Sequence, residues 1–156
     1  MGGRPLTLAT GRHPYEVCTL IAALTIGVVL QVGGAVAPRS VSTAMPPTVQ
    51  AAWETGLVIA GALGLAGVAW PRRRLLPGLG LELVGITVLG TVSAMYSIAL
   101  YAVTGMQAVA AGAFVTGTAV ASWWRWGQII RDLRRLGRAA EAGTTIDVPL
   151  LVEGDR

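Results

Sequence analysis

The side chains that could do chemistry are few in this chain and differ widely in their surroundings. It has one histidine, His13, and one cysteine, Cys18. A nucleophile needs a base within hydrogen-bond reach, and a zinc site needs a cluster of Cys, His or carboxylate ligands. His13 is interpreted as a water-facing residue before an apolar run, and Cys18 as a small packing residue within it. No nucleophile–base pair, metal site or intrachain disulfide is therefore expected.

Glu54 and Glu82 are the acidic residues that fall well inside apolar segments. A charge at the centre of a bilayer costs roughly 2.5–3.5 kcal/mol, so a carboxylate there often marks a proton or ion path. Each lies about one helical turn from the end of its segment, which favours ion pairing. We expect Glu54 to meet Arg39, and Glu82 to lie below Arg72–Arg74. Because they are near opposite faces, they form no acid–base pair.

The sequence contains no Walker, Rossmann or G-x-S-x-G signature and no metal-binding motif. It predicts no catalytic residue, no bound cofactor and no metal, and gives no support for an enzyme.

The composition is that of a membrane protein. Of 156 residues, 53% are apolar and only 13% are charged, against about 25% charged residues in a soluble domain. All twelve basic residues are arginine, and the net charge is +4. Since the arginines stand beside apolar segments, anionic lipid is favoured as a partner over nucleic acid.

Four apolar segments have the length of a membrane span, which is about 20 residues for a hydrocarbon core of roughly 30 Å. They are residues 15–37, 49–70, 79–103 and 106–124. The sequence therefore predicts an all-α membrane protein with four transmembrane helices. Loops are expected at 38–48 and 71–78, and a minimal turn at Thr104-Gly105. A signal peptide ending at Ala35-Val36-Ala37 is the alternative for the first segment, although Pro38 disfavours cleavage there.

Arginine counting predicts the orientation. With both termini in the cytoplasm, eleven arginines lie inside and only Arg39 lies outside, as expected for the cytoplasmic side of a membrane. The tryptophans agree, with Trp53 at the outer interface and the other four at the inner interface, namely Trp70, Trp123, Trp124 and Trp126. We expect a multi-pass protein of the cytoplasmic membrane with N-in/C-in topology.

A basic amphipathic helix is predicted at 127–142. At about 100° per residue, one side collects Trp126, Ile129, Ile130, Leu133, Leu136 and Ala140, and the opposite side collects Arg131, Arg134, Arg135 and Arg138. Together with Arg125, these arginines are expected to face lipid or a partner. The alternative is a helical extension of the fourth span whose arginines anchor its topology. Residues 1–14 are expected to form a cytoplasmic arm, and 143–156 a disordered tail.

Rows of small residues allow membrane helices to approach closely. The second span has such a row at Gly56, Ala60 and Gly64, and the fourth has one at Ala113, Gly117 and Ala121. Gln31 lies deep in the first span and is predicted to hydrogen-bond another helix. These residues serve association either within the bundle or between copies of the chain.

Several short motifs carry a resemblance to a known family. His13-Pro14-Tyr15-Glu16 precedes the first span, Pro46-Pro47 and Trp53 open the second, and Leu81-Glu82 with Gly85 opens the third. Trp124-Arg125, Gln128-Ile129 and Arg131-Asp132-Leu133-Arg134-Arg135 close the fourth. This order resembles small four-span, holin-like membrane proteins of actinobacterial phages.

The resemblance implies a role but transfers no catalytic residue. A holin-like protein self-associates in the cytoplasmic membrane and permeabilises it, which allows its functional partner, an endolysin, to lyse the host cell. Two other hypotheses remain. One is a non-enzymatic membrane scaffold or accessory subunit that recruits a partner through the arginine-rich helix. The other is a small transporter, which requires an intramembrane charge closer to the midplane.

Overall fold

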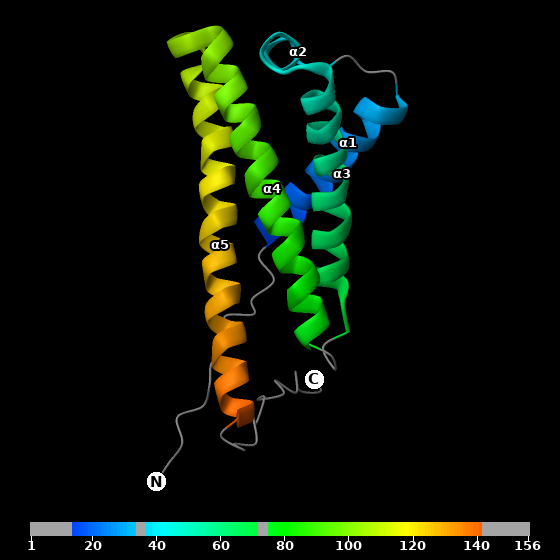
Figure 1. Cartoon of the computed structure of the whole chain (residues 1–156), viewed down its shortest axis with the longest axis vertical. Coiled ribbons are helices and arrows are strands. Elements are labelled where there is room, and N and C mark those ends of the chain that lie inside the picture. Colours follow the sequence, from blue (N-terminus) through cyan, green and yellow to red (C-terminus); the bar gives the residue numbers. More distant parts are fainter. Residues whose placement is uncertain (1–13, 34–36, 72–74, 142–156) are drawn as a thin grey trace, which may run out of the picture.

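The computed structural model describes residues 14–33, 37–71 and 75–141, and every regular element in these ranges is a helix. The elements are α1 (Pro14–Val32), α2 (Arg39–Ala44), α3 (Pro47–Ala69), α4 (Leu75–Thr104), the 3-10 helix η1 (Gly105–Ala108) and α5 (Val109–Glu141) (Figure 1). The all-α prediction is confirmed. Most of the predicted arm (1–13) and the predicted tail (143–156) lie outside the described residues.

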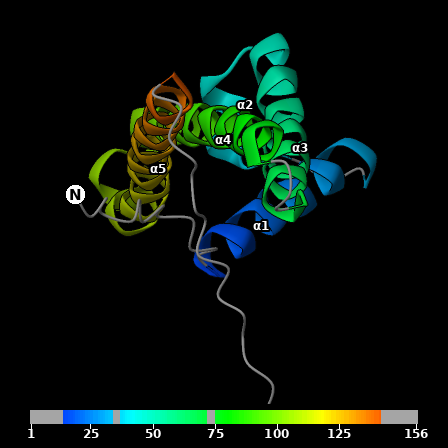
Figure 2. The same ribbon diagram turned by 90° about the horizontal axis from the view of Figure 1, so that it is seen from below.

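Three helical segments are long and apolar enough to cross a membrane: Pro14–Val32, Pro47–Ala69 and Leu76–Arg135. The third has 60 residues and is folded into a hairpin, with α4 and α5 side by side (Figures 1 and 2). Gly105 makes the reversal with a φ of 53°, which glycine adopts without steric cost. Large apolar side chains such as Phe114 are exposed over the described surface, which suits contact with lipid.

Several element boundaries differ from those predicted. The first helix ends at Val32 rather than at 37, and the segment expected as a loop at 38–48 contains α2. Val41 anchors α2 because its side chain is fully buried. Pro77 and Gly78 belong to α4 rather than to a turn. Proline is tolerated there because the N–H groups of a first helical turn have no partner within the helix.

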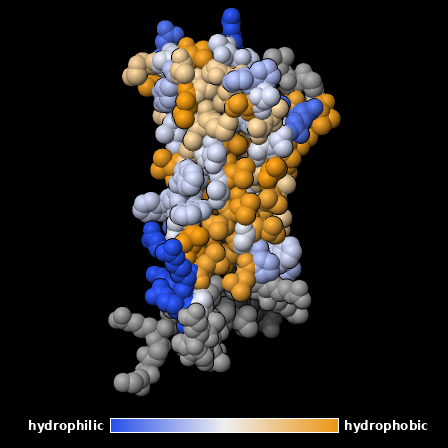
Figure 3. Space-filling view, in the orientation of Figure 1, coloured by the Kyte–Doolittle hydropathy of each residue, from blue (hydrophilic) through white to orange (hydrophobic). Residues whose placement is uncertain are grey.

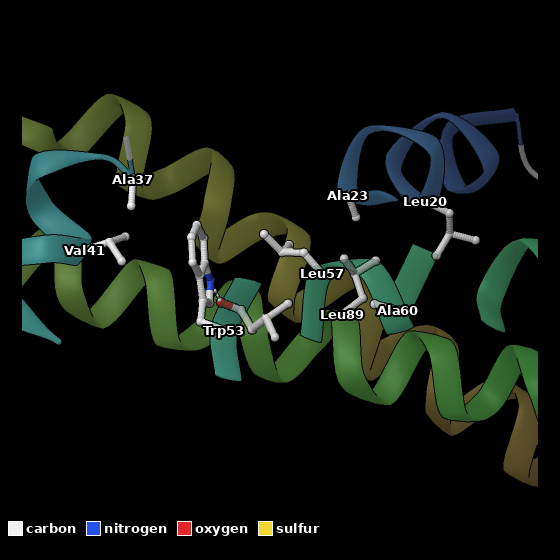
Figure 4. Close-up of a cluster of buried hydrophobic side chains, with 9 residues drawn as sticks. Leu20, Ala23, Ala37, Val41, Trp53, Leu57, Ala60 and Leu89 are labelled. Atoms are coloured by element: carbon white, nitrogen blue, oxygen red, sulfur yellow. Dashed lines mark hydrogen bonds between the residues drawn. The ribbon is translucent and has the colours of Figure 1, made fainter. Parts of the chain in front are cut away.

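Trp53, which was predicted to lie at the outer interface, packs its side chain in the core of the bundle. Its side chain is 4% exposed, and Nε1–H donates to the carbonyl oxygen of Val92 at 3.1 Å. Burial of an indole is favourable when its N–H finds such a partner. The same core contains Leu20 and Ala23 of α1 and Leu57 and Ala60 of α3 (Figure 4).

Glycines set the distance between α3 and α4. A Cβ at Gly85 of α4 would meet the backbone of Gly64, and one at Gly67 of α3 would meet the backbone of Glu82. Gly56 faces the side chain of Val92. The row Gly56, Ala60 and Gly64 is therefore buried within the bundle, where it packs α3 against its own neighbours.

This packing predicts opposite effects for two identical substitutions in α4. Gly85→Ala places a methyl group against the backbone of Gly64 and should destabilise the fold by about 1–3 kcal/mol, as overpacking does. Gly80→Ala meets nothing within 4 Å and should stabilise the helix by up to about 1 kcal/mol. Melting temperatures in detergent, followed by tryptophan fluorescence, measure both. Equal melting temperatures of the two variants would contradict the close approach of α3 and α4 at Gly85.

Candidate functional site: a buried ion cluster beside a lateral cleft

Three charged side chains from three helices meet inside the bundle: Glu16 of α1, Glu82 of α4 and Arg125 of α5. Arg125 donates from Nη2 and Nε to Oε1 of Glu82, at 2.6 and 3.1 Å, and its Nε is 3.4 Å from Oε2 of Glu16. The side chains are 14% exposed for Glu16 and Arg125 and 9% exposed for Glu82. Two carboxylates therefore share one guanidinium nitrogen in a largely buried place.

The surrounding helices hold this cluster in position. Gly67 lets α3 approach the backbone of α4 at Glu82. On both sides of Glu82 along α4, Leu79 and Ile86 pack with Ile129, which lies one turn beyond Arg125 on α5. Because Ile129 is 1% exposed, these contacts shield the ion pair from solvent and strengthen its electrostatics.

The cluster leaves Glu16 incompletely coordinated. Its Oε1 atom is buried and accepts no hydrogen bond within the described residues. Breaking a buried ion pair by removing one partner is costly, because it leaves an uncompensated charge. The arrangement thus favours one alignment of α1, α4 and α5 over alternatives in which these charges separate.

Two charged residues, Arg125 and Glu54, have different neighbours from those expected. Arg125 was predicted to face lipid or a partner, but it points to Glu82 and Glu16, because α4 presents Glu82 to α5. Glu54 accepts a hydrogen bond from Gln50 Nε2 at 2.9 Å instead of pairing with Arg39. The expected neighbours of Glu82, residues 72–74, lie outside the described residues.

Glu16 is the site residue that the sequence reasoning missed, because it stands at the very start of the first span. A signal for it existed. In an N-in topology the start of the first span, the start of the third and the end of the fourth share one membrane level. Glu16, Glu82 and Arg125 occupy those three positions, and opposite charges at one level tend to pair.

A cleft of about 700 Å³ adjoins the cluster. Its lining comes from α1, α4 and α5, and Figure 2 shows α5 to the left of α4 and α1 below it. Its lining comprises Tyr15, Glu16 and Thr19 of α1, Ile86 and Leu89 of α4, and residues of α5 between Thr116 and Gln128. Glu16 and Arg125 stand at one end of the cleft, and Thr116 stands at the other.

Of the residues proposed for helix association, some contact another helix of the chain and some are exposed. Gln31 donates to Oγ1 of Thr55 on α3 at 3.0 Å, so it bonds another helix of its own chain. Ala113, Gly117 and Ala121 of α5 are exposed, and a Cβ at Gly117 would meet nothing within 4 Å. This row has no helix of the described chain packed closely against it.

The arginine-rich segment is a continuation of α5 and not a separate surface helix. Its apolar side is occupied, because Ile129 and Leu133 pack on α4. This arrangement corresponds to the alternative of a helical extension of the span. The side chains of Leu136 and Ala140 lie outside those described. Arg131, Arg134, Arg135 and Arg138 are exposed, and the lower part of α5 is hydrophilic in Figure 3.

No protein-family model, curated protein or solved structure matches this chain. The site must therefore be interpreted from its own geometry. Within the described ranges, no group of three or more His, Cys, Asp or Glu residues has an arrangement that could hold a metal ion. The arrangement pairs charges between helices and leaves an open cleft beside them.

The cluster predicts a specific pattern of stability. Arg125→Met leaves two buried carboxylates without this guanidinium and should lower the free energy of unfolding by about 3–5 kcal/mol. Adding Glu82→Gln should restore part of the loss, because it removes one of the uncompensated charges. Thermal melting in detergent measures both effects.

Arg131→Met is the matched control, since Arg131 is exposed and surface substitutions usually change stability by less than about 0.5 kcal/mol. If the variants at 125 and 131 melt alike, the ion cluster does not hold the three helices together.

Proposed function

We propose that the chain is a holin-like protein that self-associates in the cytoplasmic membrane and permeabilises it, so that an endolysin can reach the cell wall. One observation carries this proposal. The row Ala113, Gly117 and Ala121 has the spacing for close helix contact, yet it is exposed along α5.

The two rows of small residues differ in burial, and this difference supports the proposal. The corresponding row at Gly56, Ala60 and Gly64 is buried against α1 and α4. In lipid, helices associate through the van der Waals contacts that such small residues permit, since burial from water no longer drives them together. A second row of the same kind without a partner in its own chain supports contact with another copy.

The proposed topology has four spans with both termini in the cytoplasm. In its support, α4 and α5 have 30 and 33 residues, and each exceeds the length that a bilayer requires. Arg39 begins α2 at one end of the molecule, and the arginines of α5 lie toward the other (Figure 1). This distribution agrees with the positive-inside rule.

In this mechanism, permeabilisation is a collective event. Copies accumulate as dispersed molecules and associate when their concentration makes contact between α5 rows favourable. The area of each contact is small, so association depends steeply on how closely the backbones approach. No catalytic step is involved, which agrees with the interpretation of the chain as a non-enzyme.

Gly117→Leu tests the proposal without disturbing the fold, because a Cβ at Gly117 meets open space. The bulky side chain keeps the helices apart, so abrupt depolarisation of induced cells should be delayed at least about twofold or lost. A voltage-sensitive dye and culture density record the event, with and without a co-expressed endolysin.

Phe114→Leu is the matched control. Phe114 is 82% exposed on the same helix but lies outside the row, so its timing should equal that of the native chain. Native timing in the Gly117→Leu variant, at equal membrane content, would exclude the row as the association surface.

A second candidate function is a membrane scaffold that binds a partner through the arginine side of α5. The exposure of Arg131, Arg134, Arg135 and Arg138 favours it. Anionic lipid is the alternative target of this surface, with about 1 kcal/mol contributed by each arginine near the headgroups.

Replacing these four arginines with glutamine separates the two functions. A holin that senses anionic lipid should depolarise the membrane at a changed time after induction. A scaffold should accumulate without depolarisation in both the native and the substituted form. Unchanged depolarisation timing in the substituted form would contradict lipid sensing by this surface.

A further inference from the structure

The cleft between α1 and α5 has the position and length of a lipid site. It opens between two helices that have no extensive contact with each other, and both expose apolar side chains to the surroundings, such as Ile21 and Val120. From Thr116 to Arg125 the cleft follows ten residues of α5, and the nine steps between them span about 13 Å at 1.5 Å per residue. An acyl chain entering from the side can lie along this length.

The walls of the cleft offer few free hydrogen-bond donors, although several of the lining residues carry hydroxyl groups. Thr19, Thr116, Thr118 and Ser122 each donate to the carbonyl four residues earlier in their own helix. Their hydroxyl hydrogens are therefore already used, as is common for Ser and Thr inside helices. A buried water needs two to four polar partners, so these walls favour hydrocarbon over water.

One end of the cleft is polar. Glu16 contacts Arg125 there at 3.4 Å, and its second oxygen has no hydrogen-bond partner among the described residues. The terminal torsion of a glutamate is broad, so a rotation of the carboxyl group can offer either oxygen to a donor. Tyr15 and Trp124 border the same end, each 68% exposed, and such side chains favour the headgroup level of a membrane.

We propose that this cleft binds one phospholipid whose headgroup carries a primary amine. The ammonium donates to Glu16, and an acyl chain lies between α1 and α5 against Ile86 and Leu89. An ammonium has N–H donors to give, whereas the quaternary nitrogen of a choline headgroup has none.

Gly117 and Ala121 border the cleft and also belong to the row through which copies are proposed to associate. The lipid site does not depend on that association. It is therefore tested on purified protein, by a measurement that does not involve depolarisation.

The experiment is native mass spectrometry of the delipidated full chain in detergent. Phosphatidylethanolamine and phosphatidylcholine with identical acyl chains are titrated separately. We expect one phosphatidylethanolamine per chain, bound about tenfold tighter than phosphatidylcholine, as one hydrogen bond to a charged group provides. Glu16→Gln should bring the two affinities to within about twofold. The matched control Glu54→Gln should keep the tenfold preference, because Glu54 is absent from the cleft lining.

Ala121→Trp provides a second variant that leaves the ion cluster intact. Ala121 is exposed and lines the cleft, so an indole there should fill it and abolish retention of both lipids. This variant keeps the test valid if Glu16→Gln unfolds. Equal affinity of the native chain for the two lipids would overturn the proposal. Native preference in Glu16→Gln or native retention in Ala121→Trp would do the same.

Discussion

The rest of the structure depends on the constraint that a buried guanidinium places on the helices around it. Arg125 lies one residue beyond Trp124, within α5, and in an apolar bundle its charge must meet opposite charge. Glu82 and Glu16 provide that charge from α4 and α1. Because α1 and α5 have few other contacts, the cluster is what ties α1 to α5. It also forms one end of the cleft.

Close backbone packing makes this arrangement possible. Gly64 and Gly85 bring α3 and α4 together, and Gly67 lies against the backbone of Glu82. A glutamate held so near its neighbouring helix cannot easily turn toward lipid, and α5 meets it with Arg125. Trp53 fixes the other half of the same α3–α4 pair through its hydrogen bond to Val92. Close contact and polar pairing thus act together, as expected where burial from water contributes little.

Once these contacts are made, two surfaces of α5 remain without a described helix packed on them. One is the small-residue row around Gly117, and the other is the arginine side from Arg131 to Arg138. The apolar side of the same extension is occupied by α4 through Ile129 and Leu133. The exposed small-residue row of α5 is the surface that the proposed association would use. The proposals for holin-like action and for a lipid in the adjoining cleft both depend on the fact that α4 covers only one side of α5.

The sequence by itself determined the helical class, the membrane character and the approximate position of each long helix. These properties depend on apolar run length and on turn residues such as Gly105, which are local. It also predicted that Gln31 would bond another helix, although not that the partner would be Thr55. Only the tertiary structure decided the partners of the charged residues. Glu82 and Arg125 are 43 positions apart, and their pairing depends on how α4 and α5 face each other, which a one-dimensional pattern does not specify. For the same reason the two small-residue rows, alike in sequence, differ in use: the row in α3 is enclosed by its neighbours, and the row in α5 is exposed.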